Sequence, residues 1–245
     1  MTRFGTLIGL LLLFRAPIVE DPPPVPDMPA FKERGADIKY LGKNVWLDAN
    51  PASRRVLVRA TICANRVQLE EFMCLKRTKE HESIVAADLV PSVFHAALLA
   101  SGAVSGEPCK FEDGKFHPPT GDRMEIIVEW KDGDKFKRAR AQDWIRDVVA
   151  KQPIKHDFVF AGSQWVTSPI SGEKVYLGNE GDLVSVANFS SSIIDIAIRS
   201  SSANVSLQFE TFPDRIPPVD TEVTVIFRSL EKRPQDASVK KKADG

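Results

Sequence analysis

The sequence predicts a β-rich α+β fold, a single domain of mostly antiparallel strands and hairpins with one main helix packed on the sheet. Three observations carry this prediction. Apolar side chains alternate with period two in several segments, an Asp-Gly turn joins two of these segments, and one segment has both the apolar stripe and the end signals of a helix. At 245 residues, less its polar ends, the chain fits the size range of one domain.

The first strand is predicted at Arg55–Cys63, where apolar side chains on one face alternate with a mixture of polar and apolar side chains on the other. The extended pattern resumes at Leu69–Leu75, which predicts a hairpin of these two segments. The register of this hairpin decides whether Cys63 and Cys74 face each other. A tight turn pairs Cys63 with Glu70 and keeps the cysteines apart, whereas a wide loop brings them opposite.

The main helix is predicted from about Pro91 to Ser101. A proline suits the first turn of a helix, and Gly102 suits the left-handed position after its end. Phe94, Ala97 and Leu98 form one apolar stripe along this segment. We therefore expect the helix to lie across the sheet.

The clearest hairpin joins Met124–Trp130 to Lys135–Ala141. Between them stands Lys131-Asp132-Gly133-Asp134, and Asp-Gly supplies the positive φ that a tight hairpin turn requires. A short helical turn is expected at Ala141–Val148. Glycine, serine and proline separate the further predicted strands, which are Phe158–Phe160, Trp165–Thr167, Lys174–Leu177, Asp182–Phe189 and Glu222–Phe227.

Outside the predicted domain, residues 37–229, the two ends differ from it in composition. Residues 1–16 resemble a signal peptide without a clear cleavage site, because Arg3 precedes an apolar run that is too short to cross the ~30 Å of a bilayer core as a helix. Residues 17–36 are rich in proline and are predicted to be a disordered linker, and residues 230–245 a disordered polar tail. We therefore expect an exported protein, periplasmic or at the cell surface, with no membrane span beyond the N-terminal segment.

The charge balance argues against a nucleic-acid partner. Lysine plus arginine and aspartate plus glutamate each total 33, so no overall attraction to a phosphate backbone is expected. The basic residues of 135–140 alternate with or flank aspartates, which is typical of a solvated strand face. The sequence also has no G-x-S-x-G elbow, Walker loop, G-x-G-x-x-G, H-E-x-x-H or C-x-x-C, so the common hydrolase and nucleotide chemistries have no support.

Thiols, imidazoles and carboxylates gather in the first half of the chain, and they form a candidate ligand or metal cluster. Thiolate and imidazole suit zinc or copper, and a carboxylate beside them could orient an imidazole. The spacings match no standard metal signature, and the ordinary alternatives are buried thiols, a packed histidine, a solvated turn, or a disulfide between Cys63 and Cys74 that leaves Cys109 over. The cluster comprises Cys63, Cys74, Glu80, His81, Glu82 and His95.

A second candidate is an aromatic binding platform made of Trp144, Arg146, Gln164 and Trp165. Aromatic faces stack on the apolar surfaces of sugars or peptides, while amide and guanidinium groups fix their orientation. The alternative is that both tryptophans serve the core or a hairpin.

Several blocks of the sequence, taken in order, carry a family resemblance. They are Cys63–Cys74, Cys74–Ser83, His95–Ala103, Ala139–Val148, Phe158–Val166, Gly181–Phe189 and Arg215–Val225. These blocks resemble the bacterial YdjY-domain family, whose members are mostly uncharacterised exported proteins. The resemblance spans roughly Gly42 to Phe227 and includes both cysteines and the Thr78–Ser83 run. It implies an exported domain and no particular reaction.

Together these observations favour a non-enzymatic, exported cell-envelope domain that binds an unidentified protein or small-molecule partner. No cofactor is predicted. The alternative is a metal- or redox-site accessory protein or enzyme that uses Cys63, Cys74, His81 and Glu82.

Overall fold

The structure is a computed structural model that describes residues 37–200 and 207–231. The predicted signal segment 1–16 and linker 17–36 lie outside the described residues. So does the predicted tail 230–245, apart from Leu230 and Glu231.

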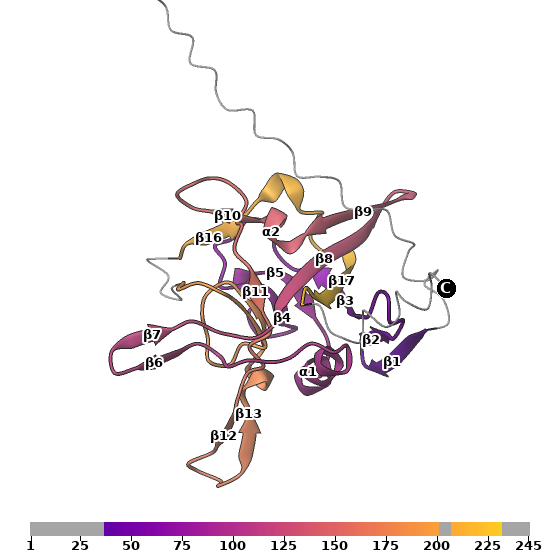
Figure 1. The fold of residues 1–245 in the computed structure, drawn as a ribbon. Coiled ribbons are helices and arrows are strands. Elements are labelled where there is room, and N and C mark those ends of the chain that lie inside the picture. Colours follow the sequence, from indigo (N-terminus) through magenta and orange to yellow (C-terminus); the bar gives the residue numbers. More distant parts are fainter. Residues whose placement is uncertain (1–36, 201–206, 232–245) are drawn as a thin grey trace, which may run out of the picture.

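Strands dominate the described residues, as the period-two pattern predicts (Figure 1). The strands of the first half are β1 (Ile38–Gly42), β2 (Val45–Asp48), β3 (Arg55–Ile62), β4 (Glu71–Leu75), β5 (Ser83–Ala87), β6 (Lys110–Glu112), β7 (Lys115–His117), β8 (Arg123–Asp132) and β9 (Lys135–Arg140). Those of the second half are β10 (Ile145–Asp147), β11 (Phe158–Val159), β12 (Trp165–Thr167), β13 (Lys174–Tyr176), β14 (Asp182–Ser185), β15 (Ile194–Ile196), β16 (Phe209–Thr211) and β17 (Glu222–Ser229). The helices are α1 (Pro91–Ala100), α2 (Ala141–Trp144) and the 3₁₀ helices η2 (Glu80–Glu82), η3 (Leu177–Glu180) and η5 (Pro213–Arg215).

Eight strands close into a barrel in the order β3-β17-β8-β11-β15-β14-β4-β5, with β5 pairing back to β3. Neighbours are antiparallel except for the parallel pairs β4–β5 and β14–β15. The β1–β2 hairpin extends the sheet beyond β3, and β9 lies outside β8. The predicted β-rich domain with one main helix is confirmed, whereas its closure into a barrel was not predicted.

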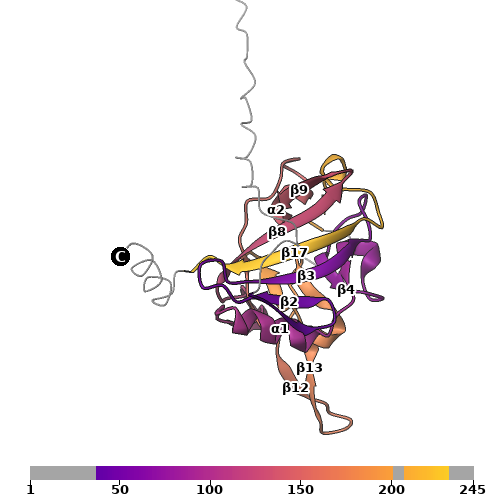
Figure 2. The ribbon, with the colours of Figure 1, turned by 90° about the vertical axis from the view of Figure 1, so that its right-hand side faces the viewer.

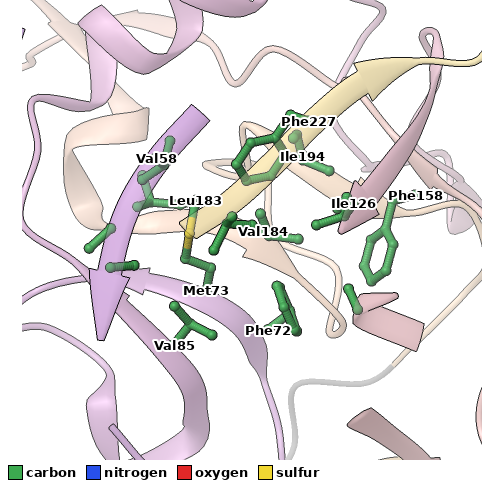
Figure 3. Packing of buried hydrophobic residues seen from close by; sticks show 14 of the residues in the cluster. Val58, Phe72, Met73, Val85, Ile126, Phe158, Leu183, Val184, Ile194 and Phe227 are labelled. Atoms are coloured by element: carbon green, nitrogen blue, oxygen red, sulfur yellow. The ribbon is translucent and has the colours of Figure 1, made fainter. Parts of the chain in front are cut away.

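The core fills the inside of this barrel, and each of the eight strands contributes to it (Figure 3). Burial of such side chains is the main favourable term in folding, at roughly 25 cal/mol per Å² of apolar surface. The side chains that meet there are Val58, Phe72, Met73, Val85, Ile126, Phe158, Leu183, Val184, Ile194 and Phe227, all fully or almost fully buried.

Helix α1 lies against β1, β2 and β3, as Figure 2 shows beneath the β2 strand. Phe94 buries its ring against Phe227 of β17, with the ring centroids 4.9 Å apart. Gly102 has φ of +89°, so it ends the helix in the predicted left-handed conformation. The predicted helix is thus confirmed. Within residues 37–200 and 207–231, no helix is long and apolar enough to cross a membrane.

The predicted hairpin around Asp132-Gly133 is also confirmed. Strands β8 and β9 pair antiparallel up to Asp132 and Lys135, and Gly133 takes φ of +59° in the two-residue turn. The turn chemistry is local, which is why the sequence alone locates it. The short helical turn expected at Ala141–Val148 is present only as α2, because Ile145–Asp147 forms strand β10 instead.

The predicted hairpin of Arg55–Cys63 with Leu69–Leu75 is wrong. Strand β5 lies between β3 and β4, antiparallel to β3 and parallel to β4. Every residue of β5 is buried, so Ser83–Ala87 supplies a central strand that was not predicted. The cysteines therefore stand on two strands that flank a third, and neither predicted register applies.

Candidate functional site

Cys63 and Cys74 meet across strand β5. The Cys63 backbone N–H donates to Ile84 O at 2.9 Å, and Cys74 stands opposite Ala86 in the β4–β5 ladder. The Cys63 thiol has two acceptors for its single proton, Ser83 O at 3.3 Å and the sulfur of Cys74. Cys74 is fully buried and Cys63 is half-buried. All three cysteines, including the buried Cys109, are free thiols in this structure.

The surroundings of the two sulfurs shift the pKa values of Cys63 and Cys74 in opposite directions. Donation to Cys74, burial, and the negative charges of Cys74 and Glu80 together raise the pKa of the Cys63 thiol far above its usual range. The pKa of Cys74 is lowered because its sulfur accepts hydrogen bonds from Cys63, from the Ser83 hydroxyl and from the Lys79 backbone N–H, against the opposing effect of burial. Of the two, Cys74 is thus the sulfur that more readily becomes a thiolate.

The other members of the predicted cluster point in different directions. The His81 side chain is 76% exposed, and its Nε2 lies 3.6 Å from Glu82 Oε1. Glu80 accepts a hydrogen bond from the Arg77 backbone N–H, and Glu82 faces Glu70. Among the described residues, no three or more histidine, cysteine, aspartate or glutamate side chains surround a common centre that could hold a metal ion. The structure thus brings together the two cysteines, with Glu80 close enough to act on both electrostatically.

Lys79, which the sequence placed in a solvated run, instead reaches into the protein. Its Nζ lies 2.8 Å from Asp182 Oδ1 and 3.7 Å from Glu70 Oε2, and it sits 3.8 Å from the centre of the Phe189 ring. Asp182 is almost fully buried and also accepts a hydrogen bond from the Ser191 hydroxyl. Burial lowers the pKa of Lys79, but the hydrogen bond to Asp182 and the surrounding carboxylates outweigh it and raise that pKa. Lys79 therefore ties the loop after β4 to the start of β14.

Two carboxyl groups are buried in the same part of the barrel wall. Glu71 accepts hydrogen bonds from the Ser185 hydroxyl at 3.0 and 2.9 Å, and Ser192 donates in turn to Ser185 at 2.6 Å. The Asp195 carboxyl accepts hydrogen bonds from the side-chain amide of Asn188 and from the backbone N–H of Ile196. Burial raises the pKa of both Glu71 and Asp195 well above the usual range and so favours their protonated forms. An acidic residue inside an apolar strand was the only sequence signal for these groups.

His95 belongs to a different neighbourhood from the cysteines. Its Nδ1 lies 2.7 Å from Tyr176 Oη, and its ring meets the Phe160 ring edge to face at 5.1 Å. Burial lowers the pKa of His95, and its hydrogen bond to the Gly162 backbone opposes this effect. The contact between His95 and Tyr176 joins α1 to the end of β13.

The four residues of the predicted aromatic platform lie in two separate regions. Trp144 is completely buried in the core against Phe72 and Trp130, so it has no face to offer a ligand. Arg146 forms an ion pair with Glu210 at 3.0 Å. Gln164 and Trp165 are at the β12–β13 hairpin, which projects at the opposite end of the molecule from α2 (Figure 1). Trp165 is 63% exposed, and its ring is tilted by 38° to that of Tyr176, with the centroids 5.2 Å apart.

A cavity of about 500 Å³ lies beside the β6–β7 hairpin, and the sequence did not indicate it. Arg199 stands over two aromatic rings of that hairpin, with its Cζ 5.6 Å from the Phe111 centroid and 5.8 Å from that of Phe116. Strand pairing brings Phe111 and Phe116 opposite each other, 5.3 Å apart. The cavity is lined by Cys109, Lys110, Phe111, Phe116, Asn188, Ser190, Arg199, Ser200 and Gln208.

The polar groups around this cavity differ in whether they have partners among the described residues. Lys110 is paired with Glu107 at 3.1 Å and Glu112 at 3.5 Å, and Asn188 is held by Asp195 and the Ser200 backbone. By contrast, no carboxylate of the described residues lies within ion-pair distance of Arg199. The Ser200 hydroxyl is buried without a hydrogen-bond partner in this part of the chain. Such unmet polar groups are costly in a free protein and typical of ligand sites.

No curated protein and no solved structure matches the chain. The model of the YdjY domain matches residues 47–228, which cover nearly the whole described domain and most of the chain. This match agrees with the resemblance in the sequence blocks around Cys63, Lys79 and Trp165, and the chain therefore belongs to the YdjY domain family.

Proposed function

We propose that this YdjY domain is an exported, non-enzymatic binding module of the cell envelope, and that it holds a small organic anion in the cavity beside the β6–β7 hairpin. The observation that carries the proposal is the cavity's combination of Arg199, which has no carboxylate partner among the described residues, with the unpartnered Ser200 hydroxyl. Export rests on the sequence: a basic residue, a short apolar run and a proline-rich segment precede the domain.

The size and lining of the cavity support a small-molecule ligand. Pockets for small ligands have volumes of about 300–1,000 Å³ and combine apolar walls with a few polar groups, and this cavity has about 500 Å³. The rings of Phe111 and Phe116 provide the apolar wall. An anionic group on the ligand would pair with Arg199, because guanidinium binds carboxylates in a bidentate, charge-assisted manner.

The proposal is tested with three probes of nearly equal shape: 4-phenylbutyrate, 4-phenylbutanamide and 4-phenylbutylamine. We expect only the carboxylate to bind, measured by calorimetry and by a rise in melting temperature. Arg199→Gln should weaken its binding at least tenfold. Lys110→Gln is the matched control, because Lys110 lines the same cavity but already has two carboxylate partners.

Equal binding of all three probes, or equal loss in both variants, would contradict an anion site. Export is tested separately by fractionating cells that express the full chain. We expect the protein in the envelope fraction, and recovery in the cytosol would contradict that part of the proposal.

A further inference from the structure

Strand β6 belongs to a two-stranded sheet and has β7 as its only strand neighbour among the described residues. Asp113 and Gly114 join the two strands, and both have positive φ, of 51° and 73°, as in a type I′ turn. Such a turn is closed by a hydrogen bond between the residues on either side of it, here Glu112 and Lys115. The β6–β7 ladder therefore starts with a hydrogen-bonded pair.

The alternation of this ladder turns the main chain of Phe111 away from β7. Hydrogen-bonded and non-hydrogen-bonded pairs alternate along antiparallel strands, so the next pair, Phe111 with Phe116, is not hydrogen-bonded. The N–H and C=O of Phe111 consequently point outward from the hairpin, where no backbone group of the described residues bonds to them. Phe111 thus offers one donor and one acceptor to an added strand.

The cavity beside the hairpin borders this outer edge of β6. Cys109, Lys110 and Phe111 are consecutive and all line it, whereas β7 contributes only Phe116. Side chains of consecutive strand residues point to opposite faces, so a cavity that touches all three extends around the edge of the strand. Arg199 and the outward backbone groups of Phe111 therefore border the same space.

The groups around this space match the end of a polypeptide chain. Arg199 supplies a guanidinium for a terminal carboxylate, and the rings of Phe111 and Phe116 supply an apolar surface for the last side chain. The edge of β6 can hydrogen-bond the main chain of an extended peptide, as in β-strand addition. A simple aryl carboxylate would use the first two features and would leave the backbone groups of Phe111 to water.

Building on the anion site proposed above, we propose that its ligand is the carboxyl-terminal end of an extended peptide with an apolar last residue. The terminal carboxylate pairs with Arg199, and the last side chain lies against Phe111 and Phe116. The peptide main chain adds as a third strand at the outer edge of β6. Main-chain pairing carries little sequence information, so the partner is recognised by its chain end and its apolar last side chain.

The test compares four ligands of the full chain by calorimetry: 4-phenylbutyrate, the peptide acid acetyl-Ala-Ala-Phe, its carboxyl-terminal amide, and the same acid with both alanine nitrogens methylated. The peptide acid should bind roughly tenfold more tightly than 4-phenylbutyrate, because it adds main-chain hydrogen bonds. The amide should bind roughly tenfold more weakly than the acid, since it has no charge to pair with Arg199. Methylation should remove the advantage over 4-phenylbutyrate, because a methylated nitrogen cannot donate. Arg199→Gln should weaken binding of the acid and leave that of the amide unchanged.

Hydrogen exchange followed by NMR locates the peptide on the strand. The Phe111 amide should exchange more slowly in the complex with the peptide acid, whereas 4-phenylbutyrate should leave its rate unchanged. Lys110 is the matched control in the same strand, because its N–H already faces His117 of β7 in a hydrogen-bonded pair. Its exchange should slow less than that of Phe111.

The outcomes separate this proposal from the anion site itself. Equal affinity of the peptide acid and 4-phenylbutyrate, equal affinity of the acid and its amide, or unchanged exchange at Phe111 in the peptide complex would each overturn the peptide assignment. Saturable binding of 4-phenylbutyrate that depends on Arg199 would still support the anion site in that case. Binding of neither carboxylate would overturn both proposals.

Discussion

The guanidinium of Arg199 lies against the ring of Phe111, with 5.6 Å between Cζ and the ring centroid. Phe111 is itself 65% exposed, so the contact stands at the surface and faces solvent on one side. A cation that lies over aromatic faces keeps its charge, and its N–H groups that point away from the rings remain available. The pair therefore presents a positive group and an apolar wall to anything that enters the cavity.

Ser200→Ala should change stability and binding in opposite directions. The buried Ser200 hydroxyl has no partner in the described structure, so its removal should stabilise the ligand-free protein by about 1 kcal/mol. The same change should reduce the gain in melting temperature that 4-phenylbutyrate produces. Thermal unfolding with and without the probe measures both effects. A variant that is less stable when free, with ligand stabilisation unchanged, would contradict this role of Ser200.

Lys79→Met should destabilise the fold strongly. It leaves the buried carboxylate of Asp182 without its cation, and breaking one side of a buried pair costs about 3–5 kcal/mol. Lys137→Met is the matched control, because Lys137 pairs with Asp132 at a half-exposed position where such pairs contribute about 0–1 kcal/mol. Denaturant unfolding should separate the two variants clearly, and similar losses would refute the structural role of Lys79.

Glu71→Gln should make the protein more stable at neutral pH. A carboxyl whose pKa is higher in the folded than in the unfolded state binds its proton more tightly on folding, so its contribution is favourable at acid pH and is lost as pH rises above the usual value of 4.5. Glutamine keeps the shape without the ionisation. We expect the stability difference between variant and wild type to grow from pH 4.5 to pH 8 and to reach about 1–3 kcal/mol.

Glu125→Gln provides the comparison for that pH series, because Glu125 is a more exposed carboxylate paired with Arg228. Its stability difference from the wild type should stay within about 1 kcal/mol and should not increase towards pH 8. A flat difference for Glu71→Gln as well would show that Glu71 is ionised without penalty in the folded protein.

His95 should confer a loss of stability in acid. The pKa of His95 is lower in the folded protein, so folding excludes its proton, and stability should decline as pH falls below the usual value of 6.5. His95→Gln should weaken this decline. Tyr176→Phe should cost about 1 kcal/mol at pH 8, because it removes the 2.7 Å hydrogen bond to His95. Melting temperatures between pH 5 and 8 test both, and an unchanged acid decline in His95→Gln would exclude the histidine as its source.

Local sequence patterns predicted where helices and turns form better than they predicted which strands pair with each other. The Asp132-Gly133 turn and the α1 helix are specified by neighbouring residues, and both stand where expected. The insertion of β5 between β3 and β4 depends on strands that close a barrel, which no single window of sequence contains.

The candidate site shows the same limit. The cysteine pair was already marked by its residue types, but the partner of Lys79 is Asp182, more than one hundred positions further along the chain. The cavity likewise needs Phe111 and Arg199 from distant segments. Trp144 and Trp165 carry the same side chain, and only the fold distinguishes the core residue from the exposed one.

The location of a bound anion tests the central claim most directly. In a titration of the isotope-labelled protein with 4-phenylbutyrate, followed by ¹H–¹⁵N NMR, we predict that the backbone signals of residues 109–116 and 188–200 shift together and saturate with one dissociation constant. The same titration of Arg199→Gln should leave them in place. Shifts confined to another region, such as the β12–β13 hairpin around Trp165, or no saturable shift at all, would contradict the account.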